Sequence, residues 1–287
     1  MLATLNDVLP RARRGGYAVG LFNAVNLELA RGVISAAERL CSPVILGTAE
    51  VLLPFGPLED LAPLLVDMAR RATVPVVVHF DHGLSIDSCA RAIRLGFTSV
   101  MLDASSKPYA DNVRESAEIA SYAHARGATV EAELGHVGDA GDSVEGGAES
   151  SRGKPEDWYT DPEQALDFVR STGVDALAIA IGTLHGTYRA EPRLDYDRLQ
   201  RIASTAEVPL VLHGGSGLSD AAFAEAISRG VSKVNVFTDI NLAAAAACAE
   251  ALASGKRALT DLIPVEVAAV EAAVAEKLRV FGSIGRA

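Results

Sequence analysis

Three histidines each close an apolar run of the sequence, and a glycine follows each of them. The runs end at His82, His185 and His213. Such runs are typical of buried parallel strands, whose C-terminal ends meet at one rim of an α/β protein. A single histidine at a strand end more often makes a structural hydrogen bond, but three on one rim match a catalytic zinc site with one open position. We therefore predict a metal site formed by these three side chains.

Acidic residues stand at the same strand ends. Asp81 directly precedes His82, which suits a general acid or base beside the metal, although the same spacing allows a carboxylate that only orients a ligand histidine. Asp103 ends another strand candidate, and Glu133 lies on a barrel strand that has no solvated face. These two acids are predicted either to support the ligands or to bind a second or displaced metal ion, and the sequence leaves both readings open.

Glycine and small polar residues after the last strands predict an anion site. Gly214-Gly215-Ser216-Gly217 precedes a helix, and Asn235 and Thr238 end the eighth strand candidate. Loops after strands seven and eight of such barrels often hold phosphate through backbone N–H groups and a helix N-terminus. Asn23 is expected on the same rim. A metal, a carboxylate and an anion site together suit carbon–carbon cleavage of a ketose phosphate, its isomerisation, or metal-assisted hydrolysis.

The elements that position these residues alternate regularly. Strand candidates cover residues 17–23, 44–48, 74–83, 99–103, 129–135, 178–186, 210–215 and 233–238. Helices are expected at 2–14, 26–40, 58–72, 85–95, 109–126, 162–171, 195–204, 219–229, 239–253 and 264–280. Eight strand–helix units predict an α/β (β/α)8 TIM barrel, a single domain over residues 1–287 with extra terminal helices. A doubly wound open sheet is the less favoured alternative.

Residues 136–160 interrupt this alternation. Glycine, aspartate, serine and glutamate dominate the segment, which has few apolar anchors before Trp158. A connection of this length after a strand that ends at the rim predicts a mobile active-site loop.

Composition excludes several classes of protein. The chain has 287 residues, 49% of them hydrophobic, and a formal net charge of −11, with no Lys/Arg cluster that would suit nucleic acid or an anionic membrane. Its three cysteines are far apart, as expected of reduced thiols in a cytoplasm. There is no apolar signal core and no apolar run long enough to cross a bilayer. A cytoplasmic protein is expected.

In combination, the motifs resemble the class II, zinc-dependent ketose-bisphosphate aldolases, in the fructose- and tagatose-bisphosphate branch. The resemblance covers nearly the whole chain and rests on Gly16-Tyr17-Ala18-Val19, Phe22-Asn23, His79-Phe80-Asp81-His82-Gly83, Ser99-Val100-Met101-Leu102-Asp103-Ala104-Ser105, Val130-Glu131-Ala132-Glu133-Leu134-Gly135, Ala180-Ile181-Gly182-Thr183-Leu184-His185-Gly186, Leu212-His213-Gly214-Gly215-Ser216-Gly217 and Lys233-Val234-Asn235-Val236. It implies reversible retro-aldol cleavage of a ketose (bis)phosphate to dihydroxyacetone phosphate and an aldehyde, through a zinc-stabilised enediolate.

The resemblance also implies roles for individual residues. His82, His185 and His213 would bind the catalytic zinc, and Asp81 would take the proton of the C4 hydroxyl in cleavage. Asp103 and Glu133 match acids that can hold a second or displaced divalent ion. The pocket for the phosphorylated fragment matches Gly186, Gly214, Ser216, Asn235 and Thr238, with Na⁺ or K⁺ bound among these loops. The family is commonly a homodimer or homotetramer.

Two departures from the family pattern bear on the substrate. Gly141 stands where the family loop carries the glutamate that exchanges the C3 proton, with Asp142 and Glu145 nearby, and Phe237 stands where relatives have a small or acidic residue. An aromatic ring at the latter position is expected to narrow the site. The alternatives are therefore an aldolase of a deoxy, sulfonated or non-phosphorylated ketose, a non-catalytic metabolite-binding barrel, and a metal-dependent hydrolase.

Overall fold

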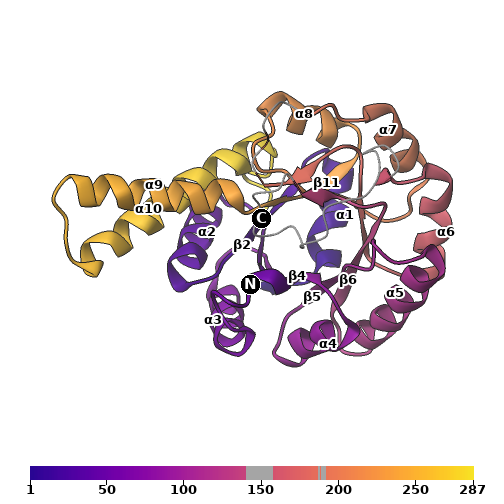
Figure 1. Ribbon diagram of the computed structural model, residues 1–287, viewed down its shortest axis with the longest axis horizontal. Helices are drawn as coiled ribbons and strands as arrows, with labels where there is room; N and C mark the ends of the chain where they lie inside the picture. Colours follow the sequence, from indigo (N-terminus) through magenta and orange to yellow (C-terminus); the bar gives the residue numbers. More distant parts are fainter. Residues whose placement is uncertain (140–157, 187, 189–191) are drawn as a thin grey trace.

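Eight parallel strands form a closed ring in the computed structural model of the chain, which describes residues 1–139, 158–186, 188 and 192–287 (Figure 1). Around the ring the strands are β2 (Val19–Asn23), β3 (Val44–Ala49), β4 (Val76–Gly83), β5 (Ser99–Leu102), β6 (Thr129–Leu134), β8 (Ala176–Ile179), β10 (Leu210–Leu212) and β11 (Val231–Val236). β4 pairs with β5 and β11 pairs with β2, so the ring has no free edge. The predicted (β/α)8 TIM barrel is confirmed.

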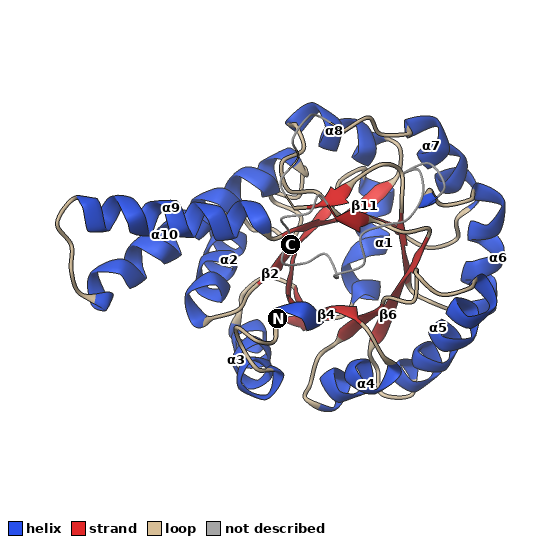
Figure 2. Ribbon diagram, viewed as in Figure 1, coloured by secondary structure: helices blue, strands red, loops and turns tan. Residues whose placement is uncertain are grey.

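Helices surround this ring on the outside, except for α1, which lies across one end of it (Figure 2). They are α1 (Leu5–Gly15), α2 (Leu27–Arg39), α3 (Leu58–Arg71), α4 (Ile86–Arg94), α5 (Tyr109–His124), α6 (Pro162–Thr172), α7 (Tyr196–Thr205), α8 (Asp220–Ser228), α9 (Thr238–Ala253), α10 (Leu259–Val280) and the short 3-10 helix η1 (Glu50–Leu52). Several begin at a side chain that accepts a backbone N–H, as at Ser85, whose hydroxyl accepts from Ser88 N at 3.1 Å.

The N-terminal end of the barrel is closed by α1. Its apolar side chains, including Leu5, Val8 and Leu9, are buried in one cluster with inward-facing strand residues such as Ile45 and Val77. Residues 2–3 were predicted as part of this helix, but they form strand β1 (Leu2–Ala3), which pairs with the start of β4. The helix consequently begins at Leu5, with Thr4 before it as the N-cap.

Inward and outward side chains alternate along each barrel strand. The outward residues, together with the inner faces of the helices, form a large buried apolar cluster that includes Phe80, Val100 and Phe168. The inward residues change in character along the barrel axis. They are apolar near α1, and they become histidines and acids toward the C-terminal ends of the strands, where the predicted site lies.

The strand predicted at 178–186 is interrupted, because β8 ends at Ile179 and a separate short strand begins at Leu184. Strand β7 (Gly138–Asp139) pairs with β9 (Leu184–His185), which fixes the start of the predicted loop 136–160 beside one metal-site histidine. Residues 140–157 of that loop, with Gly141, lie outside the described residues. The helices α9 and α10 pack against each other and extend away from the barrel as a hairpin, called here the helical arm (Figure 1).

Among the helices of the described segments, none is both long enough and apolar enough to span a lipid bilayer.

Candidate active site

The three predicted ligands converge at the C-terminal rim. His82 ends β4, His185 ends β9 and His213 follows β10. The ring centroid of His82 lies 4.9 Å from that of His185 and 4.6 Å from that of His213. One nitrogen from each ring can be chosen so that all three lie within 4.8 Å of one another, and all three residues are buried. The fold therefore brings together the three side chains that the sequence predicted as a metal site.

A bulge in β4 makes this convergence possible. Strand alternation points Val77, His79 and Asp81 into the barrel, so a regular strand would point His82 outward. The pairing of β4 with β5 shifts register between Phe80 and Gly83, and His82 adopts a left-handed backbone with φ 44°. This extra residue turns the His82 ring toward the barrel axis. Two consecutive residues, Asp81 and His82, therefore serve the same site.

Asp103 holds the His82 ring from the side. Its Oδ2 accepts a hydrogen bond from His82 Nδ1 at 2.9 Å, which leaves His82 Nε2 to face the other histidines. The second oxygen of Asp103 accepts from Ser105 Oγ at 2.7 Å, and Ser105 Oγ also contacts His136 Nδ1 at 2.9 Å. The chain from His82 through Asp103 and Ser105 to His136 fixes the orientation of this ligand.

Glu131 does the same for His213, and sequence reasoning assigned it no such role. Its Oε1 accepts from His213 Nε2 at 2.8 Å, while its Oε2 lies 2.7 Å from Lys233 Nζ. All three side chains are fully buried. One signal in the sequence could have pointed to Glu131 and Lys233, since both are charged residues on the barrel strands β6 and β11. A strand inside a barrel exposes no side chain to solvent, so a charge there must have a buried partner.

Asp81 lies beside the three rings and is held by two amides. Asn23 Nδ2 donates to its Oδ2 at 2.9 Å, and Asn235 Nδ2 donates to its Oδ1 at 3.1 Å. Burial by itself would raise the pKa of Asp81, but positive charge on His82, His213 and Lys233 outweighs it and holds the pKa below its usual range. The carboxylate is therefore ionised and oriented, as a proton acceptor must be.

Glu133 has a different environment from Asp81. It is buried, its Oε1 accepts from Val137 N at 3.0 Å, and its Oε2 has no hydrogen-bond partner among the described residues. Burial first, and the Asp103 charge second, raise the pKa of Glu133 to about 8. Oxygens of Asp103 and Glu133 and a nitrogen of His82 lie within 4.8 Å of one another, so they form a second group able to bind a cation.

The glycine-rich loop after β10 packs closely against the loop that carries His185. Gly214 has φ 64°, and a Cβ built there would lie 2.4 Å from Leu184 O, so only glycine fits. Tyr188 Oη donates to Gly214 O at 2.7 Å and accepts from Leu184 N at 2.9 Å, which ties the two loops together. Gly186 also has a positive φ of 95°.

The predicted anion residues do not all meet the histidines. Ser216 is buried in the glycine-rich loop and Thr238 is the first residue of α9. No hydrogen bond joins either hydroxyl to the three rings in the described part of the structure. Phe237, whose ring was expected to narrow or redirect the site, directly follows β11. β11 ends at Val236, and the ring of Phe237 is buried in the apolar cluster between the strands and the helices.

The donor set fits a metal ion. His82 Nε2 and His213 Nδ1 face each other at 2.8 Å, while the other nitrogen of each ring faces Asp103 or Glu131, so both facing nitrogens are available to a metal ion. Burial lowers the pKa of His82, but the charges of Asp81 and Asp103 outweigh burial and raise that pKa to about 10. His185 Nε2 is buried and has no hydrogen-bond partner among the described residues, as expected of a nitrogen that binds a metal ion.

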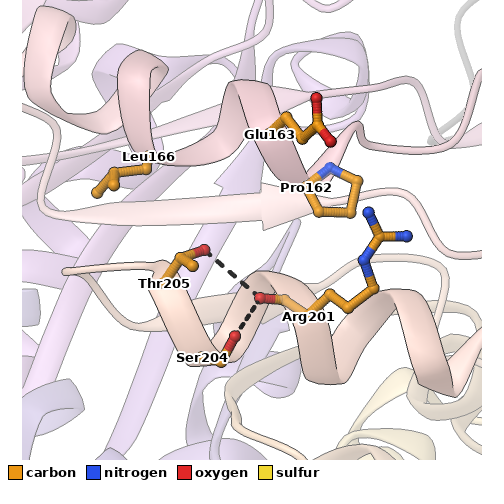
Figure 3. A pocket seen from close by; sticks show the side chains of 6 residues that line it. All are labelled: Pro162, Glu163, Leu166, Arg201, Ser204 and Thr205. Atoms are coloured by element: carbon orange, nitrogen blue, oxygen red, sulfur yellow. Dashed lines mark hydrogen bonds between the residues drawn. The ribbon is translucent and has the colours of Figure 1, made fainter.

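A groove on the outside of the barrel offers a contrast. It lies between α6 and α7 and is lined by Pro162, Glu163, Leu166, Arg201, Ser204 and Thr205 (Figure 3). Its two hydroxyl groups already donate to Arg201 O, so their protons are not available to a ligand. The groove contains no histidine, and the rim therefore remains the candidate active site.

Known proteins match this chain over its full length. A family model described as fructose-bisphosphate aldolase class-II matches residues 3–286. The fructose-bisphosphate aldolase of Geobacillus stearothermophilus is 40% identical over 291 residues, which span 100% of this chain and 99% of that protein. A 6-phospho-5-dehydro-2-deoxy-D-gluconate aldolase of Halalkalibacterium halodurans is 38% identical over 296 residues, 100% of this chain and 98% of that protein.

A solved structure agrees with these matches. The crystal structure of the YdjI aldolase from Escherichia coli K12 superposes with a TM-score of 0.89 at 38% identity and covers 100% of both chains. The family resemblance of the sequence motifs is thereby confirmed. This chain belongs to the class II fructose-bisphosphate aldolase family, whose reaction is the reversible aldol cleavage of a phosphorylated sugar.

Proposed function

We propose that the protein cleaves a ketose phosphate at a zinc ion held by His82, His185 and His213, with Asp81 as the group that moves the proton. The observation that carries this proposal is the convergence of three buried imidazole nitrogens beside the buried Asp81 carboxylate, which two amides hold in place. Zinc in such a site would polarise the ketone carbonyl of the substrate and stabilise the negative charge that cleavage leaves on it. The proton transfer in the reaction is carried out by a side chain of the protein.

Asp81 starts the cleavage. Its carboxylate accepts the proton of the C4 hydroxyl, the oxygen forms the carbonyl of the aldehyde product, and the C3–C4 bond breaks with its electron pair staying on the C3 fragment. That fragment leaves as dihydroxyacetone phosphate after C3 is protonated. The amides of Asn23 and Asn235 keep the carboxylate in place, since both donate to it. In condensation the same group returns the proton.

The phosphate of the substrate would bind to the loops after β10 and β11. Gly186, Gly214, Ser216, Asn235 and Thr238 are the residues proposed here, and the positive φ of Gly214 and the tie through Tyr188 support a fixed loop. A monovalent cation, Na⁺ or K⁺, is proposed among these loops. Asp103 and Glu133 are proposed to hold a second or displaced divalent ion, because their oxygens and a nitrogen of His82 lie within 4.8 Å of one another.

The sugar itself is proposed to be of the fructose or tagatose bisphosphate type. Relatives include an aldolase named for fructose bisphosphate and one named for a 2-deoxygluconate phosphate, so a deoxy ketose phosphate is the second candidate.

A homodimer or homotetramer is also proposed, with the helical arm in its interface. Leu242, Ala245, Ala246, Ala249 and Leu252 form one exposed apolar face along α9. Small residues at this spacing allow another helix to approach closely. A cytoplasmic location is part of the proposal, supported by three cysteines that form no disulfide.

Aldol cleavage by zinc-loaded protein tests the central proposal. The substrates are fructose 1,6-bisphosphate, tagatose 1,6-bisphosphate, a deoxyketogluconate phosphate and a non-phosphorylated ketose, each with and without EDTA. We expect release of dihydroxyacetone phosphate from a phosphorylated ketose, lost with EDTA and restored by zinc. Full activity in EDTA, or zinc binding without turnover of any sugar in the panel, would contradict it.

A further inference from the structure

Two opposite charges lie at the bottom of the active site without contact to solvent. Lys233 comes from β11 and Glu131 from β6, and two other strands, β8 and β10, separate these in the ring. Their side chains are fully buried and meet at 2.7 Å across the barrel interior. The two atoms lack hydrogen-bond geometry, so the attraction is mainly between charges.

A buried ion pair of this kind needs a reason beyond stability. Removing two charges from water is costly, and well-packed apolar side chains of similar volume often stabilise a fold as well or better. The neighbouring layer of the barrel interior has no such ion pair among its described residues. Inward residues such as Ile45, Val77 and Met101 fill it with apolar groups. The ion pair therefore points to a role in the site above it.

Glu131 links that pair to a proposed metal ligand. One carboxylate oxygen faces Lys233 Nζ, and the other accepts from His213 Nε2 at 2.8 Å. That contact directs the opposite nitrogen, His213 Nδ1, toward His82 Nε2 at 2.8 Å. We propose that Lys233 is a positioning residue, which holds the Glu131 carboxylate so that His213 presents Nδ1 to the metal.

A comparison with His82, the other proposed ligand that a carboxylate holds, explains why a lysine is needed beside Glu131. Asp103, which holds His82, lies near the rim with 18% of its side chain exposed and receives hydrogen bonds from Ser105. Glu131 lies deeper and has no exposure. Solvent and the Ser105 hydroxyl stabilise the Asp103 carboxylate. The buried Glu131 carboxylate is stabilised instead by the positive charge of Lys233.

This inference rests on the proposed zinc site and is tested by zinc affinity measured with a competing chelator. We expect Lys233→Met to weaken zinc binding about 10- to 100-fold, the range seen when groups behind a ligand are removed. Because a lone buried Glu131 could prevent folding of that variant, the double variant Glu131→Gln with Lys233→Met removes both charges together. It is expected to fold and to bind zinc at least about tenfold more weakly.

Ser99→Ala is the matched control. Ser99 is buried in the same layer, where its hydroxyl contacts His79 Nδ1 at 2.7 Å, and it touches none of the three ligand histidines. We expect its zinc affinity to stay within about twofold of the wild type. A cobalt-substituted double variant should show an altered visible absorption spectrum, because that spectrum reports ligand geometry.

The outcomes separate the two claims. If the wild type itself fails to bind zinc, the proposed function is wrong. If the wild type binds zinc and the folded double variant binds it equally tightly, with an unchanged cobalt spectrum, Lys233 does not position His213.

Discussion

The two ends of this barrel are built from the same strands and have opposite chemistry. Toward α1, inward positions are apolar, as Leu21, Ile45 and Val211 show. Two positions nearer the rim, Leu21 of β2 is followed by Asn23 and Val211 of β10 is followed by His213, so these inward positions become polar. Closely packed apolar residues secure the lower end, whereas hydrogen bonds and ion pairs secure the upper end.

Residues that stabilise the fold and residues that form the proposed site therefore lie at opposite ends of one barrel, and not in separate domains. Substitutions among the apolar residues near α1 act mainly through changes of packed volume. The polar end is held instead by carboxylate partners for two of the three proposed ligands, Asp103 for His82 and Glu131 for His213. Substitutions at the two ends should therefore change different measured quantities.

The largest expected effect is at a ligand. His185→Ala removes a buried nitrogen that has no other partner among the described residues, so we expect cleavage to fall below detection and zinc binding to be lost. Because the lower end does not depend on the metal, the thermal midpoint of the metal-free variant should match that of the metal-free wild type. A variant that keeps stoichiometric zinc and activity would remove His185 from the ligand set.

Asp81→Asn should separate chemistry from metal binding at the same end. The substitution keeps the shape of the side chain but removes the proton acceptor, so we expect kcat to fall about 10²- to 10⁴-fold. Zinc affinity should change little, since Asp81 is not proposed as a ligand. Wild-type kcat in zinc-loaded Asp81→Asn would show that this carboxylate only supports its neighbours.

Leu9→Ala tests the lower end. Leu9 is fully buried where α1 closes the barrel, and its truncation should lower the free energy of unfolding by about 2–5 kcal/mol. Chemical denaturation measures this loss, and kcat should remain within about twofold at a temperature where the variant is folded. A large fall in kcat with little loss of stability would mean that the two ends are coupled.

Ser105→Ala is the smallest change expected at the upper end. It removes one hydrogen bond to Asp103 and the contact with His136, but Asp103 still accepts from His82. Loss of one hydrogen bond to a charged group is worth about 1.5–3 kcal/mol at most, and part of that returns through water at this partly exposed position. We expect a several-fold loss of zinc affinity. Ser204→Ala in the outer groove is the control and should leave affinity unchanged.

Much of the architecture could be predicted because its signals are local. Glycines and apolar runs mark the strands and helices, and strands that run parallel bring His82, His185 and His213 to one rim. Elements of two residues, β1 and the β7–β9 pair, have no periodicity to reveal them. The roles of Glu131 and Lys233 also could not be predicted, because their contact depends on which strands face each other across the closed ring.

The bulge at His82 sets stability against activity at a single residue. A left-handed backbone costs about 1–2 kcal/mol for a residue with a Cβ, and glycine escapes this penalty. Glycine at position 82 would relieve this backbone cost, but it would also remove the hydrogen bonds of His82 to Asp103 and His213 together with the proposed metal ligand. The strained backbone is therefore the cost of directing the His82 ring into the site.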